Sequence, residues 1–255
     1  MSAPDQARRV LVTGGAGGLG AALVRALVGA GHAVDFTYRA SAAEAEALCA
    51  ELAAAHPGAQ VAGHALDLAD RAALDAFCAR AEEERWYGLV HNAGQSADAL
   101  ALMLDQDRLE AAMQVNFYAL TRLAKALTRG MVRARAGRIV AIGSVAALRG
   151  NTGNAAYAAT KGALIAYCRT LAIETARRGV TVNVIAPGFV DTRMMAPYAA
   201  HRAGMERQIP AGRFADPAEV AALARFLMED AAAYVTGAVL PVDGGLTAMM
   251  GVHRA

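Results

Sequence analysis

The amino-acid sequence predicts an α/β fold, a doubly wound parallel sheet of about seven strands with helices on both faces. Three observations indicate this class. Short runs rich in β-branched residues alternate with longer alanine-rich helical patterns along the whole chain. The short runs are almost continuously apolar, which is typical of strands that helices bury on both faces. A glycine-rich segment connects the first run to the first helical pattern.

The strands and helices are expected to alternate in chain order. Apolar runs of strand length lie at residues 9–13, 33–38, 60–65, 88–91, 137–142, 180–185 and 238–242. Helical patterns lie at residues 18–30, 42–55, 71–83, 107–133, 155–178 and 217–228. No linker, fixed-period repeat or low-complexity tail interrupts them. Residues 1–255 are therefore interpreted as a single domain with a short flexible N-terminus at 1–7.

The composition excludes several classes of protein. Apolar residues make up 56% of the chain and charged residues 19%, which excludes intrinsic disorder. A net charge of +2 argues against a nucleic-acid binder. Arg25, His32, Arg149 and Asp243 interrupt or end the most apolar stretches, so no membrane span is expected. The first residues lack the apolar core of a signal peptide, and three cysteines without C-x-x-C spacing suggest neither disulfides nor a metal site. We expect a cytoplasmic protein.

The glycine-rich segment begins directly after the first strand and leads into the first helix. Backbone amides in such a turn can approach a pyrophosphate, which then lies at the positive N-terminus of the helix. The segment fits two spacings, G-x-G-x-x-G and T-G-x-x-x-G-x-G, and the alternative interpretation is a tight turn without a ligand. Its place at the first strand–helix turn of a Rossmann-type sheet favours dinucleotide binding by Gly14, Gly15, Ala16, Gly17, Gly18, Leu19 and Gly20.

The end of the second strand indicates which dinucleotide binds. An acidic residue there would hydrogen-bond the ribose 2′-hydroxyl of NAD, whereas an arginine accommodates the 2′-phosphate of NADP. Tyr38 stands where the acid would be expected, Arg39 follows it, and Asp35 lies too early, inside the strand. The alternative interpretation of Arg39 is a solvated side chain at a strand end. Because an arginine can bind phosphate through two charge-assisted hydrogen bonds, the sequence favours NADP.

A tyrosine and a lysine lie one turn apart in the helical pattern at 155–178. Tyr157 and Lys161 are spaced four residues apart and so share one helix face. A phenol, whose pKa is near ~10, exchanges protons poorly at neutral pH unless a nearby ammonium stabilises its ionised form. Ser144 follows the fifth strand, at the carboxyl end where α/β sheets contact their ligands. Alone, the pair is compatible with surface packing; together with the serine and the glycine loop it predicts an active site.

These motifs, taken with several others, resemble the short-chain dehydrogenase/reductase family. The resemblance covers about residues 9–246 and rests on TGGAGGLG, Asn92-Ala93-Gly94, Asn116, Ser144, Tyr157-x-x-x-Lys161 and Pro187-Gly188-x-x-x-Thr192. Within the family, the segments at 143–164, 177–194 and 209–227 most resemble 3-oxoacyl-[acyl-carrier-protein] reductases.

The resemblance implies catalytic roles for four residues. Tyr157 would give a proton to the substrate carbonyl oxygen as hydride arrives from the nicotinamide. Lys161 would lower the pKa of Tyr157 and hydrogen-bond the nicotinamide ribose. Ser144 would hold the substrate oxygen, and Asn116 would support a water-linked proton relay through Lys161. The implied chemistry is general acid catalysis of carbonyl reduction by NADPH.

The resemblance also implies further cofactor contacts, at Asp67, Leu68, Asn92, Ala93, Gly94, Pro187, Gly188, Val190 and Thr192. This chain departs from the family at two positions. Gly17 stands where NADP-dependent relatives often carry a basic residue, so recognition of the 2′-phosphate would depend on Arg39 and Ser41. His91 stands where many relatives have asparagine, and we interpret it as a packing residue.

Arginines gather locally although the net charge is small, at Arg129, Arg133, Arg135, Arg138, Arg177 and Arg178. In the resembling reductases, positions matching Arg135 and Arg178 contact the acidic acyl carrier protein near the site entrance; the alternative is a solvated helix end. By resemblance, the segment 192–213 would cover the substrate, with Met194, Met195 and Met205 offering an adaptable apolar surface or ordinary core contacts. Family members are usually tetramers, so a homotetramer is implied.

Two classes of function remain open at this point. The first is NADPH-dependent reduction of a 3-oxoacyl thioester in fatty acid biosynthesis, or the same chemistry on acetoacetyl-CoA, a polyketide or aryl-polyene intermediate, a sugar or a steroid. The second is a non-catalytic NADP-binding sensor. The presence of Asn116, Ser144, Tyr157 and Lys161 together favours the enzyme.

Overall fold

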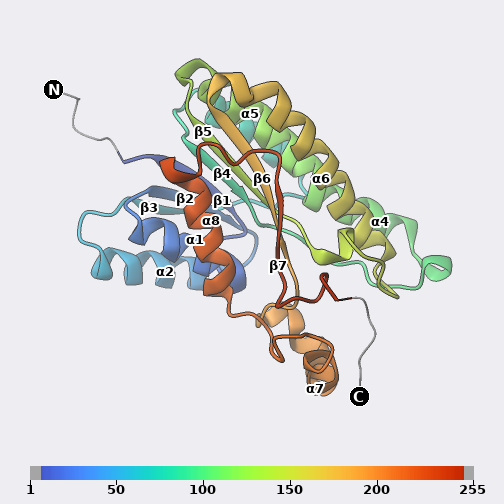
Figure 1. Cartoon of the computed structure of the whole chain (residues 1–255). Helices are drawn as coiled ribbons and strands as arrows, with labels where there is room; N and C mark the ends of the chain where they lie inside the picture. Colours follow the sequence, from blue (N-terminus) through green and yellow to red (C-terminus); the bar gives the residue numbers. More distant parts are fainter. Residues whose placement is uncertain (1–6, 250–255) are drawn as a thin grey trace.

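A seven-stranded parallel sheet forms the centre of the structure, with strand order β3-β2-β1-β4-β5-β6-β7. The structure is a computed structural model that describes residues 7–249 (Figure 1). The strands are β1 Arg9–Thr13, β2 Ala33–Tyr38, β3 Val61–Ala65, β4 Gly88–His91, β5 Gly137–Ile142, β6 Val180–Pro187 and β7 Val239–Val242. The predicted fold class is confirmed. Of the predicted flexible N-terminus at 1–7, all but residue 7 lies outside the described residues.

Helices cover both faces of the sheet. They are α1 Gly18–Gly29, α2 Ala42–Ala55, α3 Arg71–Glu82, α4 Gln106–Met113, α5 Ala119–Ala134, α6 Ala155–Thr175, α7 Arg202–Glu206 and α8 Pro217–Met228. Figure 1 shows α1 and α8 together on one side of the sheet, and α5 and α6 on the other. Short 3₁₀ turns lie at Ala101–Met103, Val145–Ala147, Ala176–Arg178, Arg193–His201 and Asp230–Ala232.

Successive strand residues pack into two separate hydrophobic cores, because side chains point alternately to the two faces of the sheet. Val10 and Val12 of β1 pack with α1, α2 and α8, whereas Leu11 between them packs with α3, α5 and α6. The same alternation occurs in β4, where Val90 and Leu89 join opposite cores. Helices therefore bury the central strands on both sides, which explains why β1, β4, β5 and β6 are almost continuously apolar in sequence, whereas the edge strands β3 and β7 are partly exposed.

Two predicted helices differ from the structure. The predicted helix at 107–133 is interrupted by a π turn at Gln114–Tyr118, which separates α4 from α5. The predicted helix at 155–178 ends at Thr175 and continues only as a 3₁₀ turn. The π turn matters for function, because such turns reposition side chains and occur often at functional sites.

The strand order places a crevice above β1 and β4. From β1 the sheet continues through β2 and β3 in one direction, and from β4 it continues through β5, β6 and β7 in the other. The loops that follow β1 and β4 therefore diverge and leave a space at the carboxyl ends of these strands. Within residues 7–249, the helices are all too short or too polar to cross a membrane.

Candidate active site

A cavity of about 500 Å³ opens at the carboxyl ends of the strands. Its lining includes every predicted cofactor and catalytic residue except Gly15 and Asn116. Eight further residues line the cavity that the sequence analysis did not assign to the site: Thr37, Tyr38, Leu66, Gln95, Val115, Ile142, Gly143 and Arg193. One space therefore brings together the glycine loop, Arg39 and Ser41, the Asn92 turn and the tyrosine–lysine pair.

The glycine loop folds so tightly that side chains do not fit at two of its positions. A Cβ on Gly20 would lie 1.9 Å from the carbonyl oxygen of Gly14, and a Cβ on Gly15 would lie 2.5 Å from the Cβ of Phe36. Gly14 also has a φ of +67°, which favours glycine. Gly15 is thus explained by packing against β2 and by its N–H donating to the Thr37 carbonyl (2.9 Å), not by lining the cavity.

The first turn of α1 has no side-chain cap. Its N-cap is Gly17, whereas α8 is capped by Asp216 with a reciprocal bond from Glu219, and α3 by Asp70. The cavity lies against this uncapped end. The N–H groups of the first turn and the positive end of the helix dipole are thereby available to an anion.

Thr13 and Asn92 join the ends of β1 and β4 at the base of the cavity. The Thr13 hydroxyl accepts hydrogen bonds from the backbone N–H groups of Asn92 and Ala93, both at 3.0 Å. The Asn92 side chain donates to the carbonyls of Thr13 (3.1 Å) and Gly14 (3.0 Å). Asn92 therefore fixes the glycine loop in addition to lining the cavity.

Tyr157 and Lys161 both lie in the first part of α6, where Lys161 is buried and Tyr157 is half-buried. The Lys161 ammonium donates to the Ile142 carbonyl at 2.8 Å and lies 5.6 Å from the centre of the Tyr157 ring. Burial lowers the pKa of Lys161 to about 8. Burial also raises the pKa of Tyr157 to about 12, and a hydrogen bond with Ser144 acts in the opposite direction.

Burial has the largest effect on the pKa of the Tyr157 phenol. Desolvation raises that pKa, so the phenol is protonated at neutral pH. Lys161 faces the ring and the Ile142 carbonyl in this arrangement. A protonated phenol beside Ser144 is the form that can donate a proton to a developing alkoxide.

Asn116 lies in the π turn, behind the wall of the cavity. Its side-chain N–H₂ donates to the Gln95 carbonyl and to the Thr160 hydroxyl, both at 2.9 Å. Its side-chain oxygen accepts from the Gln95 N–H at 2.8 Å. The residue is fully buried, and its carboxamide is held in one orientation. Asn116 therefore supports the site from behind and does not line it.

His91 is fully buried at the end of β4, next to both Thr13 and Asn116. Its Nδ1 lies 3.1 Å from the Thr13 hydroxyl, and its Nε2 lies 3.2 Å from the Asn116 carbonyl oxygen. Burial, followed by the charge of Lys161, lowers the pKa of His91 from 6.5 to about 3. The imidazole is therefore neutral at physiological pH.

We expect His91 to make the fold sensitive to acid. Between pH 6.5 and 3 the unfolded chain binds a proton at this imidazole and the folded chain does not, so stability falls as the pH falls through that window. In His91→Gln this contribution is absent. Urea unfolding at a series of pH values should therefore show the wild type losing stability relative to the variant as the pH decreases. A difference between the two proteins that stays constant from pH 7 to pH 3 would contradict this assignment.

Arg39 and Ser41 line the end of the cavity beside β2. Arg39 is exposed at the rim. Asp35 does not line the cavity, because its carboxylate is held by Arg9 (2.6 Å) and His64 (2.6 Å). The prediction that Asp35 lies too early in the strand to contact the cavity agrees with this geometry.

The lid segment is attached at both ends of the cavity. Met194 and Met195 of the 3₁₀ turn Arg193–His201 line the cavity. The Tyr198 hydroxyl donates to Asp98, which also accepts from the Asn154 side chain at 2.8 Å. Arg193 lies 3.2 Å from Glu44 in the first turn of α2. These contacts connect the segment, through Asp98, to the start of α6 and, through Glu44, to the start of α2.

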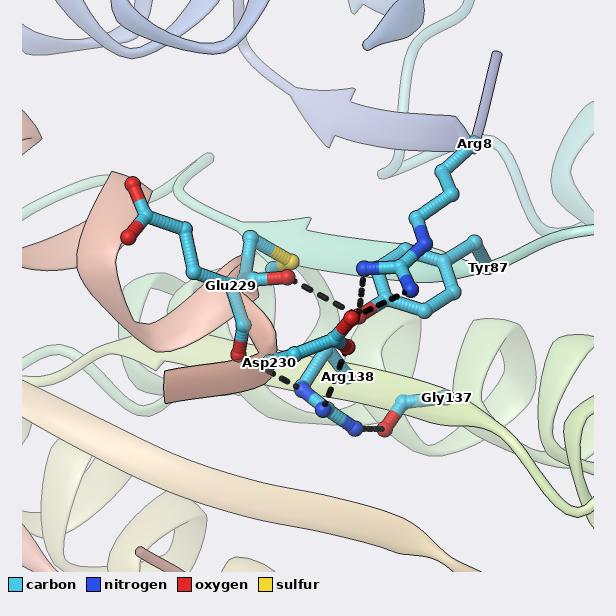
Figure 2. Close-up of polar contacts among 7 residues, drawn as sticks. Arg8, Tyr87, Gly137, Arg138, Glu229 and Asp230 are labelled. Atoms are coloured by element: carbon cyan, nitrogen blue, oxygen red, sulfur yellow. Dashed lines mark hydrogen bonds and ion pairs between the residues drawn. The ribbon is translucent and has the colours of Figure 1, made fainter. Parts of the chain in front are cut away.

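The predicted arginine cluster is not one surface patch. Figure 2 shows Arg138 reaching the Gly137 carbonyl (2.9 Å) and Asp230 (3.4 Å), close to Arg8 and Tyr87. Only 6% of the Arg138 side chain is exposed. The inclusion of Arg138 in an exposed cluster is therefore wrong, because a strand start flanked by backbone carbonyls buries its guanidinium.

The two arginines expected to meet an acyl carrier protein are exposed but lie away from the cavity. Arg135 follows the last residue of α5 and donates to the Arg177 carbonyl at 3.3 Å, and Arg178 lies two residues before the start of β6. Both stand at the amino ends of the strands, whereas the cavity lies at the carboxyl ends. Their expected place near the entrance of the site is wrong within a single chain.

The sequence and the structure match a well-populated group of proteins. Residues 14–247 match the family model described as Enoyl-(Acyl carrier protein) reductase. The chain is 38% identical over 239 residues to the 3-oxoacyl-[acyl-carrier-protein] reductase FabG of Salmonella typhimurium, with 92% of this chain and 96% of that protein covered. It is 37% identical over 246 residues to the 3-oxoacyl-[acyl-carrier-protein] reductase MabA of Mycobacterium tuberculosis, with 95% of this chain and 94% of that protein covered.

Solved structures show the same fold. A putative NAD(P) dependent gluconate 5-dehydrogenase from Beutenbergia cavernae, with bound NADP, has a TM-score of 0.90 and 36% identity, covering 95% of this chain and 97% of that one. An oxidoreductase of the short chain dehydrogenase/reductase family from Burkholderia thailandensis has a TM-score of 0.84 and 39% identity, covering 96% and 94%. The likeness therefore extends over nearly the whole chain.

Proposed function

The chain belongs to the short-chain dehydrogenase/reductase family, and from this premise we propose that it reduces the ketone of a 3-oxoacyl thioester to the 3-hydroxyacyl thioester with NADPH. The proposal rests on one observation: Tyr157, Lys161 and Ser144 line the same cavity as the glycine loop. Curated relatives named as 3-oxoacyl-[acyl-carrier-protein] reductases support the substrate class.

The residues of the cavity fit a dinucleotide. The missing Cβ at Gly20 leaves room for the tight loop, and the uncapped first turn of α1 offers N–H groups to a pyrophosphate. Arg39 and Ser41 would hold the 2′-phosphate, and Asp67 with Leu68 would bound the adenine. Asn92, Ala93, Gly94 and the segment 187–192 would lie toward the nicotinamide. When bound, NADPH supplies the hydride.

Each catalytic residue then has a separate role toward the substrate carbonyl oxygen or the proton that it receives. Ser144 donates a hydrogen bond to the carbonyl oxygen and orients it beside Tyr157. Tyr157, which holds its proton at neutral pH, gives that proton to the oxygen as negative charge develops there. Lys161, whose pKa is lowered to about 8, stands next to the phenol and can return a proton to it. Asn116 holds the π turn behind them.

An acyl carrier protein is the proposed carrier of the substrate. Met194 and Met195 give the lid side of the cavity an apolar surface that suits an acyl chain. Arg135 and Arg178 would contact an acidic carrier, but they lie at the opposite end of the sheet from this chain's own cavity. They could serve a carrier that delivers its acyl group to a neighbouring subunit, which agrees with the proposed homotetramer.

The substrate class is tested by comparing kcat/KM for NADPH oxidation across related carbonyls. We expect kcat/KM to be higher for acetoacetyl-acyl carrier protein than for acetoacetyl-CoA, and higher for both thioesters than for free ketones and 5-ketogluconate. The last compound is included because of the likeness to the putative gluconate 5-dehydrogenase. A preference for 5-ketogluconate over every thioester would overturn the proposed substrate.

The cofactor preference is tested at Arg39. Arg39→Ala should raise the KM for NADPH by about 10-fold or more and change that for NADH by less than about 2-fold, because a charge-assisted contact to the 2′-phosphate contributes roughly 1.5–3 kcal/mol. Arg85, an exposed arginine outside both the cavity lining and the segment 192–213, supplies the control substitution. Equal changes for the two nucleotides would exclude the role of Arg39.

A further inference from the structure

His91 occupies a junction between the cofactor loop and the π turn. It is the last residue of β4, directly before the Asn92 turn, and none of its surface is exposed. On one side its ring meets the Thr13 hydroxyl, which anchors the Asn92 turn (3.1 Å). On the other side it meets the Asn116 carbonyl (3.2 Å). Both ring nitrogens of this buried imidazole therefore have polar partners, and the ring connects the cofactor loop to the π turn.

The hydrogen bonds around Thr13 determine which ring nitrogen carries the proton. A hydroxyl has two acceptor lone pairs and one proton. The Thr13 hydroxyl already accepts from the N–H groups of Asn92 and Ala93, both at 3.0 Å. Its own proton is therefore left to donate to Nδ1 of His91. Nδ1 is then the acceptor, and the neutral ring carries its hydrogen on Nε2, where it donates to the Asn116 carbonyl.

The neutral state of the ring suits its neighbour. Lys161 is buried close by, and a second buried positive charge would be strongly unfavourable. An uncharged imidazole supplies an N–H donor at a place where a lysine or an arginine would add a charge. It also supplies an acceptor for Thr13 in the same planar group.

The Asn116 carbonyl lies where the backbone departs from regular helical geometry. Asn116 is the middle residue of the π turn, and its side chain is held by Gln95 and Thr160. At Gly94, an added Cβ would lie 3.4 Å from both the Asn116 side-chain oxygen and the Lys161 ammonium. Asn116 and Lys161 thus flank the same small space, and a displaced π turn would displace the support beside Lys161.

We propose that His91 is a positioning residue for the reductase reaction: through its Nε2–H it fixes the Asn116 carbonyl and the π turn, and through Nδ1 it ties them to Thr13 and the cofactor loop. This inference rests on the proposed function for its kinetic consequence. Its structural part, the Nε2–H tautomer and the bond to Asn116, stands independently of the substrate.

Three variants separate positioning from packing. His91→Leu keeps an apolar volume and removes both hydrogen bonds, so kcat should fall about 10- to 100-fold, because small misplacements behind a catalytic group have effects of this size. The KM for NADPH should change less than about 3-fold. His91→Gln keeps a side-chain donor near the Nε2 position and should retain kcat within about 3-fold of the wild type. Val90→Ala is the matched control, since Val90 precedes His91, is fully buried and faces the opposite core.

The kcat values of the three variants are measured with whichever carbonyl substrate the wild type reduces. A His91→Leu protein that folds and keeps its kcat would overturn the positioning role. So would equal losses of kcat in His91→Leu and Val90→Ala at equal losses of thermal stability. A wild type that reduces only carbonyls other than 3-oxoacyl thioesters would refute the proposed substrate and leave this comparison valid.

Nitrogen NMR of the wild-type imidazole tests the proposal even if His91→Leu does not fold. The proposal requires the Nε2–H tautomer, with no protonation of the ring from pH 5 to 8. A Nδ1–H tautomer, or titration of the ring within that range, would overturn it. This measurement needs neither substrate nor cofactor, so it also separates a failure of this inference from a failure of the proposed function.

Discussion

Tyr157→Phe is expected to lower kcat by about 10³-fold or more while NADPH binding is retained, because general acid catalysis typically contributes about 10²–10⁴-fold. The substitution removes only the hydroxyl, which is protonated at neutral pH and hydrogen-bonded with Ser144. The ring remains, so its packing beneath Lys161 is preserved. Steady-state reduction of a 3-oxoacyl thioester and fluorescence titration with NADPH measure the two quantities.

A second tyrosine on the same helix provides the control for this experiment. Tyr167 is half-buried, and its ring packs against Phe117 at 6.0 Å. Tyr167→Phe should leave kcat within about 2-fold of the wild type, since it removes a hydroxyl outside the cavity lining. Comparable turnover in Tyr157→Phe and the wild type would exclude Tyr157 as the proton donor.

Gly20→Ala is expected to remove NADPH binding at concentrations that saturate the wild type. The new Cβ would lie 1.9 Å from the Gly14 carbonyl oxygen, 2.8 Å from its carbon and 2.9 Å from the Asn92 side-chain nitrogen. Because backbone atoms cannot yield as a flexible side chain can, the loop and the first turn of α1 must separate. Overpacking of this kind costs about 1–3 kcal/mol of stability, and the phosphate site is displaced as well.

The control for Gly20→Ala is a helical glycine with room for a methyl group. A Cβ on Gly130 of α5 would approach nothing nearer than the Glu84 carbonyl oxygen, at 3.9 Å. Gly130→Ala should therefore raise the stability by up to about 1 kcal/mol and leave nucleotide affinity unchanged. Calorimetric titration of both variants with NADPH gives the comparison. Wild-type affinity in folded Gly20→Ala would show that the loop does not hold the cofactor.

The sheet and the principal helices could be predicted because their signals are local. Val10, Leu11 and Val12 form an apolar run whose members face two opposite cores, which is the pattern of a strand buried on both sides. The glycine loop could also be predicted from sequence, because the close backbone contact that requires a glycine at position 20 is made with Gly14, only six residues earlier.

The π turn could not be predicted, because it depends on contacts distant in sequence. Neither a proline nor a glycine marks residues 114–118, and the amphipathic pattern continues into α5. Asn116 is held there by Gln95 and Thr160, which other elements contribute. The hydrogen-bond partners of His91 could not be predicted for the same reason. Thr13 and Asn116 lie next to its ring only when β1, β4 and the π turn are packed together.

Charge patterns proved less informative than apolar patterns. Arg138 belongs to a run of arginines in sequence, yet the start of β5 buries it among backbone carbonyls beside Asp230. Arg135 remains exposed, but the direction of the strands places it away from the cavity. The pKa of Tyr157 likewise depends on burial, which spacing along a helix does not reveal.

We propose that this chain transfers a hydride from NADPH to a 3-oxoacyl thioester. Incubation of the purified protein with NADPH and acetoacetyl-acyl carrier protein, with both the nucleotide and the acyl product quantified, tests this reaction most directly. We expect each NADPH consumed to yield one 3-hydroxybutyryl thioester, and NADH to support a slower reaction. Consumption of NADPH without that product, or no reaction with any 3-oxoacyl thioester by protein that binds NADPH, would contradict the proposed function.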